Sequence, residues 1–263
     1  MKITGYKHPP GTGRRQIDLR IEDESLAVGW LEDDFHHFGV SIRFGDGKVE
    51  DIRMAAPRTP WNTCAGAAEP LRTLVGQPLI TRASDIGKLI DMRLQCTHVF
   101  DLTGLLLAHI GNRHQRLAHR RYHSQVPDRP IQGSEFELAS YGAGEAWLYQ
   151  DGERVMYWQV DGDRITAPPA FAGVSLSTGF RPWTEQLPEQ EAEYATILRR
   201  AMELSSARSI DSDDYPTAAD MTMKPLCHTF QQHRAPRARR NFGNALDYSE
   251  HPEQMLLNVS EIP

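Results

Sequence analysis

The sequence predicts an α+β fold, in which an antiparallel β-meander is followed by helices and then by a second antiparallel β region with a C-terminal helix packed on it. Polar and apolar residues alternate in short runs over residues 14–55, and apolar residues recur at helical spacing between 63 and 118. Alternation returns after residue 135. A period of two is typical of half-buried strands, whereas apolar residues three and four positions apart are typical of helices.

The first β region contains a β-hairpin. In FGVSIRFGDGKVEDIRM, residues 38–54, two alternating segments are separated by Gly45, Asp46 and Gly47. Asp-Gly between alternating segments is a strong hairpin signal, because both residues accept the backbone conformation of a tight turn. Residues 14–33 indicate another strand pair, so we expect the chain to open with about four strands.

Three helices are expected after this meander. The first begins at or next to Cys64, with Thr63 as its N-cap, and the second is capped by Ser84. The third has apolar residues at helical spacing from 99 to 110. Cys96 and His98 lie at its N-terminal end.

The second half of the chain begins with a segment that we interpret as a loop. Residues 119–134 are rich in Arg, Pro and Gly, which is typical of a linker or lid. Strands separated by Asp-Gly turns follow, and residues 187–208 indicate a helix with acidic residues early and Arg late. The expected organisation is an α+β region over 14–118, the loop over 119–134 and a β-rich region with a helix over 135–263, packed together as one compact unit.

Composition and charge exclude several classes of protein. The longest apolar run, LTGLLLAHI, is far shorter than the roughly 20 residues of a membrane-spanning helix. The net charge of -6 disfavours a nucleic-acid-binding protein, although basic runs at 119–123 and 233–240 indicate either a local anionic ligand or solvated loops. The first residues lack the apolar core of a secretory signal, so we expect a cytoplasmic location. In that compartment the three widely spaced cysteines are not expected to form disulfides.

Cysteine and histidine at predicted helix starts suggest a metal site. Cys64, Cys96 and His98 fall where backbone N–H groups and the helix dipole favour a thiolate. EDDFHHF, residues 32–38, adds carboxylates and imidazoles, and the combined set has the composition of a zinc or iron site. The added candidates are Asp33, Asp34, His36 and His37. Two alternatives stay open: the cysteines are core residues, or the pair Cys227 and His228 supplies one further ligand.

Histidine, tyrosine and arginine cluster near the end of the third helix, and they suggest acid/base chemistry. Helix-dipole capping accounts for some of the histidines at 109, 114, 119 and 123. Histidine and tyrosine can take a proton from a phenol or alcohol, and arginine can hold an anion. The catalytic candidates are His98, Tyr122, His123 and Arg121, and the substrate-binding candidates are Arg120, Arg129, Trp147 and Tyr149. Dinucleotide, phosphate-loop, GxSxG and HExxH motifs do not occur.

Two family resemblances accompany these motifs. WNTCAGAAEPLRTLVG, QCTHVFDL and the late CHTFQQHRAPRARRNFGNALDYSEHPEQML resemble the bacterial family of unknown function DUF2889 from about residue 14 onward, which implies no mechanism. Residues 38–110 are also similar to iron-sulfur cluster scaffold proteins, with Cys64 matching their first cysteine and Cys96 or His98 matching a later His-Cys pair. The chain has DDFHHFGV where those proteins have Cys-Gly-Asp. This second resemblance implies an α+β sandwich over 14–118.

The leading hypothesis is an enzyme that acts without a cofactor on a small oxygenated, aromatic substrate. We expect a carbon-carbon lyase of aromatic catabolism, of the retro-aldol type, which releases an aldehyde such as formaldehyde. The alternative is a protein that binds zinc, iron or an iron-sulfur cluster through Cys64, Cys96 and His98. The expected partner is a small molecule, without nucleic acid or membrane, and the choice between monomer and homo-oligomer is left open. A third hypothesis is a non-catalytic module that binds an acidic partner through the basic loops.

Overall fold

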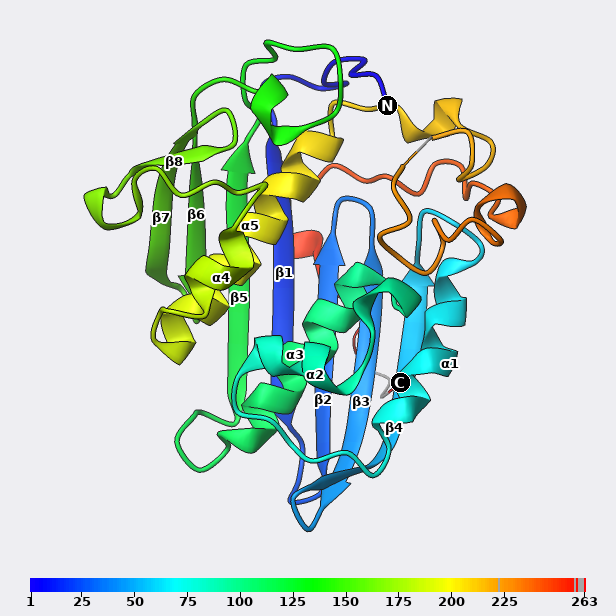
Figure 1. Cartoon of the computed structure of the whole chain (residues 1–263), viewed down its shortest axis with the longest axis vertical. Helices are drawn as coiled ribbons and strands as arrows, with labels where there is room; N and C mark the ends of the chain where they lie inside the picture. Colours follow the sequence, from blue (N-terminus) through cyan, green and yellow to red (C-terminus); the bar gives the residue numbers. More distant parts are fainter. Residues whose placement is uncertain (222, 258, 260–262) are drawn as a thin grey trace. The chain divides into compact units, whose positions relative to one another are not determined.

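The computed structural model describes residues 1–221, 223–257, 259 and 263. Its α+β class agrees with the prediction. Eight strands are hydrogen-bonded in the order β4-β3-β2-β1-β5-β6-β7-β8 (Figure 1), and every pair whose register is resolved is antiparallel. The strands are β1 Thr12–Ile21, β2 Leu26–Asp33, β3 His37–Gly45, β4 Lys48–Arg58, β5 His119–Pro127, β6 Gly144–Gln150, β7 Glu153–Asp161 and β8 Arg164–Ala167. The helices are α1 Ala68–Leu71, α2 Ile86–Leu89, α3 Thr97–Gly111, α4 Phe180–Thr184 and α5 Glu189–Ala207.

The chain divides into two compact units, and the division falls within β1 and β5. The first unit contains residues 1–16, 122–212 and 247–255, and the second contains 17–121, 213–246 and 256–263. No helix in the described part of the chain is both long and apolar enough to cross a membrane.

In the second unit, α3 packs against β2 and β3. Gly29 of β2 makes the close approach possible, because a Cβ at this position would lie 3.2 Å from Leu102 and 3.5 Å from Leu106 of α3. Every residue of β2 is buried. Since side chains alternate along a strand, the other face carries Trp30 and its neighbours, which pack on Leu256. β2 is therefore covered on both faces.

In the first unit, α5 packs against β6 and β7, and α4 packs against α5. Trp158 of β7 lies against the ring of Phe180 of α4, with ring centroids 6.2 Å apart. The α5 helix begins with Glu189 and Glu191 in its first turn, where the helix dipole favours negative charge. This unit contains the helix predicted over residues 187–208.

The predicted meander, hairpin and third helix are confirmed. β3 and β4 form the hairpin around Asp46 and Gly47, both of which have positive φ. α3 begins at Thr97 with Cys96 as its N-cap, so Cys96 and His98 lie at the expected helix start.

Other predicted elements differ from the structure. Residues 119–127 form β5 rather than a loop. Arg120 and Tyr122 occupy buried positions of that strand. Because these buried residues are polar, buried and exposed positions of β5 do not appear in the sequence as alternating apolar and polar residues. The predicted first helix consists of short 3-10 turns on either side of α1, which contains Pro70, a residue without a backbone donor. The short helix expected near the end of the chain is a 3-10 turn, Pro252–Gln254, within the described residues.

The contact between α3 and the turn before α2 predicts the effect of one substitution. A Cβ on Gly104 would lie 2.6 Å from the backbone oxygen of Ala83. Gly104→Ala is therefore expected to lower the free energy of unfolding by about 1–3 kcal/mol, although alanine favours helix more than glycine does. Urea unfolding measures this change, and Thr196→Ala on the exposed side of α5 is the control, with an expected change within about 0.5 kcal/mol. A Gly104→Ala chain as stable as the wild type would contradict this packing.

Candidate functional site

The turn between β2 and β3 is organised by Asp33. Its Oδ1 accepts hydrogen bonds from the backbone N–H groups of Phe35 and His36, each at 2.9 Å. The same oxygen lies 2.8 Å from Nδ1 of His36. Asp side chains commonly bind the backbone two residues further on, and this closes a tight turn. Asp33 and His36 are buried, so the turn presents a carboxylate and an imidazole inside the second unit.

Arg58, at the end of β4, holds this turn. Its guanidinium donates to the backbone oxygens of Asp33 at 2.5 Å and Asp34 at 2.9 Å, and to the Glu32 carboxylate at 3.1 Å. A third backbone oxygen, from His36, lies 3.3 Å away. The rigid guanidinium offers several donors in one plane, so one side chain satisfies several buried acceptors together. Nothing in the sequence pattern points to Arg58, because its role depends on the pairing of β3 with β4.

His98 completes a group with Asp33 and His36. Its ring stacks on that of His36, with centroids 3.8 Å apart and an interplanar angle of 27°. One potential ligand atom from each of Asp33, His36 and His98 lies within 4.8 Å of the others. Two imidazoles and a carboxylate form a common ligand set for zinc and for non-haem iron. We refer to these three residues as the Asp-His-His group.

Contacts at Nδ1 orient both imidazoles of the group. Nδ1 of His36 faces Asp33, and Nδ1 of His98 lies 3.7 Å from Sγ of Cys96. Metal-binding histidines are usually oriented by a partner at the ring nitrogen that does not bind the metal, and the contact of His98 with Cys96 is of this kind. The partner of His36 is Asp33, which is itself a member of the group. The ring of Phe38 stacks near both, with centroids 5.9 Å from His36 and 6.5 Å from His98. The group therefore has fixed ring orientations and an aromatic neighbour.

His37 is not part of this group. It lies 3.8 Å from the Glu32 carboxylate, and its ring centroid is 5.3 Å from that of Trp30. Burial lowers the pKa of His37, and the Glu32 carboxylate opposes this effect. Of the sequence candidates in EDDFHHF, the structure brings Asp33 and His36 to His98, while His37 lies with Glu32. Asp34 is buried and gives its backbone oxygen to Arg58.

Neither cysteine candidate belongs to the Asp-His-His group, and Cys96 is the one that contacts it. Cys96 contacts His98, and Cys64 lies 3.6 Å from the hydroxyl of Thr229. Burial raises the pKa of the Cys64 thiol to about 11 and that of Cys96 well above its usual range. Within the described residues, neither cysteine belongs to the set of ligand atoms that meet within 4.8 Å.

The acid/base candidates of β5 point to opposite faces of the strand. Tyr122 is buried and donates a hydrogen bond of 2.5 Å to Glu193 of α5. Arg121, on the other face, donates to Asp18 at 2.9 and 3.0 Å. His123 shares that face, because residues two apart on a strand point the same way. Tyr122 and His123 belong to the first unit and His98 to the second, so the four catalytic candidates do not all lie in one unit.

The predicted substrate-binding residues have different surroundings. The guanidinium of Arg129 is buried and donates to the backbone oxygens of Tyr141, Gly142 and Gly162, which indicates a structural role. Tyr149 lies beside His123, with ring centroids 6.4 Å apart. Trp147 is on the same strand as Tyr149 and packs against Tyr157. Arg120, on the buried face of β5, is 2% exposed, which leaves it little surface for a ligand.

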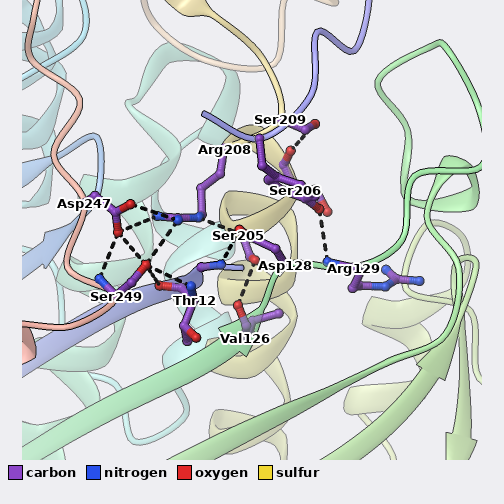
Figure 2. A network of polar contacts seen from close by, with 12 residues as sticks. Thr12, Val126, Asp128, Arg129, Ser205, Ser206, Arg208, Ser209, Asp247 and Ser249 are labelled. Carbon is purple, nitrogen blue, oxygen red and sulfur yellow. Dashed lines mark hydrogen bonds and ion pairs between the residues drawn. The ribbon is translucent and has the colours of Figure 1, made fainter. Parts of the chain in front are cut away.

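A second polar network, in the first unit, is structural. Arg208 donates to Asp128 at 3.0 Å and lies 3.3 Å from Asp247 (Figure 2). The hydroxyl of Ser249 accepts from the backbone N–H of Thr12 at 2.9 Å. These contacts join the start of β1, the end of β5 and the late segment 247–249. The donors and acceptors satisfy one another, so the network fixes chain segments and offers no reactive group.

A scan against models of protein families found no match for this chain, and a search of curated proteins also found none. The resemblances to DUF2889 and to the iron-sulfur scaffold proteins therefore stay predictions.

The surroundings of His123 predict a pH dependence of stability. Burial, with a smaller contribution from Arg14, lowers its pKa from 6.5 to about 4. Between these values the unfolded chain binds a proton that the folded chain does not, so the free energy of unfolding falls as the pH drops from 6.5 towards 4. The loss reaches about 3 kcal/mol at the low end of that window.

His123→Gln is expected to remove this part of the pH dependence. Urea unfolding at pH 7 and at pH 4.5 measures it, with the exposed His114→Gln as control. If wild type and His123→Gln lose the same free energy of unfolding between pH 7 and pH 4.5, His123 is not the source of this pH dependence.

Proposed function

We propose that the protein is a metal-dependent lyase whose divalent cation, zinc or iron, is held by Asp33, His36 and His98. The observation that carries this proposal is the meeting of these three ligand atoms within 4.8 Å. Three protein ligands leave coordination positions for water or substrate, which is typical of catalytic rather than structural metal sites.

The second element of support is the way the ligands are held. Arg58 fixes the backbone of the turn, Asp33 fixes the ring of His36, and Cys96 contacts the ring of His98. These contacts hold the turn and the two imidazoles beside one another, and binding of one cation by both histidines requires their stacked rings to rotate.

The reaction that we propose is a retro-aldol cleavage of a small hydroxylated aromatic compound. The hydroxyl proton leaves, the adjacent carbon-carbon bond breaks, an aldehyde departs, and the carbon that keeps the electron pair takes up a proton. A bound divalent cation would supply Lewis acidity that makes the first proton easier to remove. The metal-free form of this chemistry, with His98 as the base, remains the second candidate because His98 stacks against a second imidazole, that of His36.

Metal content tests the ligand assignment. Protein purified without added metal is expected to contain zinc or iron, and His36→Ala and His98→Ala are expected to lose it. Loss of a ligand should weaken binding by more than the roughly 10- to 100-fold that loss of an orienting partner causes. Inductively coupled plasma mass spectrometry measures the content, and the exposed His114→Ala is the control. Equal metal in all four proteins would contradict the assignment.

Aldehyde release tests the reaction. Wild-type protein incubated with a panel of hydroxylated aromatic compounds is expected to release an aldehyde, to stop after chelation, and to recover when zinc or iron is returned. Derivatisation and chromatography detect the aldehyde. Turnover that persists after chelation but is lost in folded His98→Ala would favour the metal-free mechanism, and absence of release from every compound would contradict the lyase proposal.

A further inference from the structure

The three cysteines lie on segments of the second unit that contact one another. They are Cys64, Cys96 and Cys227, and they are far apart in the sequence. Cys64 begins the 3-10 turn Cys64–Ala67, Cys96 is the N-cap of α3, and Cys227 lies in the segment 213–246. Three separate segments therefore each contribute one thiol.

Hydrogen bonds hold the three segments together. The backbone N–H of His228 donates to the backbone oxygen of Gln95 at 2.8 Å, which places Cys227 next to Cys96 along the paired backbones. Thr229 lies 3.0 Å from the hydroxyl of Thr63 and 3.6 Å from Sγ of Cys64. The segment that carries Cys227 thus contacts the neighbours of both other cysteines.

The three thiols also interact electrostatically. The pKa of Cys96 is raised mainly by burial and additionally by Cys64 and Cys227, and Cys227 raises the pKa of Cys64 as well. Thiolates bind soft divalent metals directly.

His228 completes a ligand set of the usual kind. Its Nδ1 lies 3.1 Å from the backbone oxygen of Leu94, so the ring can donate there and keep a lone pair on Nε2. Nε2 lies over Gly66 of the Cys64 turn, 2.9 Å from where a Cβ would stand. Burial is the main cause that lowers the pKa of His228, which favours the neutral, metal-binding imidazole.

We propose that Cys64, Cys96, Cys227 and His228 form a second metal site, which binds zinc as a structural ion. Three thiolates and one imidazole are a common tetrahedral ligand set for structural zinc. Within the described residues, no three of these four ligand atoms meet within 4.8 Å as those of the Asp-His-His group do, so binding of an ion requires rotation of the side chains. The thiols release their protons when the ion binds. The site shares no ligand with the Asp-His-His group, although its Cys96 also contacts His98 of that group.

Cobalt substitution tests this site, because cobalt(II) bound to thiolate gives a sulfur-to-metal charge-transfer absorption that imidazole and carboxylate do not give. Cobalt(II) added to the metal-free wild-type chain is expected to produce this absorption, and Cys227→Ser is expected to abolish it. His36→Ala, which removes a ligand of the other group, and the exposed His233→Ala should leave it unchanged. Zinc content should fall by about one ion per chain in Cys227→Ser, whereas His36→Ala should lose only the ion of the Asp-His-His group.

Three outcomes overturn the second site. They are the absence of the charge-transfer absorption in the wild type, its persistence in Cys227→Ser, and its loss in folded His36→Ala, which would mean one shared centre. The cobalt(II) absorption of the wild-type chain needs no variant. It therefore tests the second site even if a variant fails to fold. If His36→Ala keeps the absorption and has the same metal content as the wild type, the proposed lyase site is contradicted. The second site is not affected by that result.

Discussion

The candidate site depends on the guanidinium of Arg58. The turn between β2 and β3 is buried, and buried backbone oxygens are rarely left without hydrogen-bond donors. Arg58 supplies these donors to Asp33 and Asp34 and also contacts Glu32. It reaches them because β3 and β4 pair in a register that sets Arg58 opposite His37. Sheet pairing therefore places the donor that fixes the turn, and the turn places the carboxylate and the imidazole.

The helix α3 supplies the other half of the site. Its buried leucines pack on β2, with Gly29 allowing close contact, and this packing fixes where the helix begins. His98, in the first turn, then lies over His36. Cys96, one residue before the helix, contacts His98. The N-terminus of one helix therefore contributes to both proposed metal sites, to one through His98 and to the other through Cys96.

Local sequence patterns predicted the elements whose signals are local. The Asp46-Gly47 turn and the spacing of leucines in α3 depend on neighbouring residues only, and both predictions are confirmed. β5 was missed because a buried arginine, Arg120, stands where alternation requires an apolar residue. Asp33, His36 and His98 are among the candidates that the sequence indicates, together with His37 and Cys64. The sequence does not distinguish them, because the conformation of the turn between β2 and β3 places His36 against His98 and His37 beside Glu32. The position of Arg58 opposite His37 and the hydrogen bond between the segments that carry Cys227 and Cys96 depend on residues far apart in the sequence. No local motif predicts either contact.

X-ray diffraction from a crystal of the protein, recorded on both sides of the zinc and iron absorption edges, tests most directly whether two ligand groups in the second unit each hold a metal ion. We expect one anomalous peak among Asp33, His36 and His98 and a zinc peak among Cys64, Cys96, Cys227 and His228. A map without an anomalous peak at the first group, from protein purified with zinc and iron present, would contradict the metal-dependent lyase.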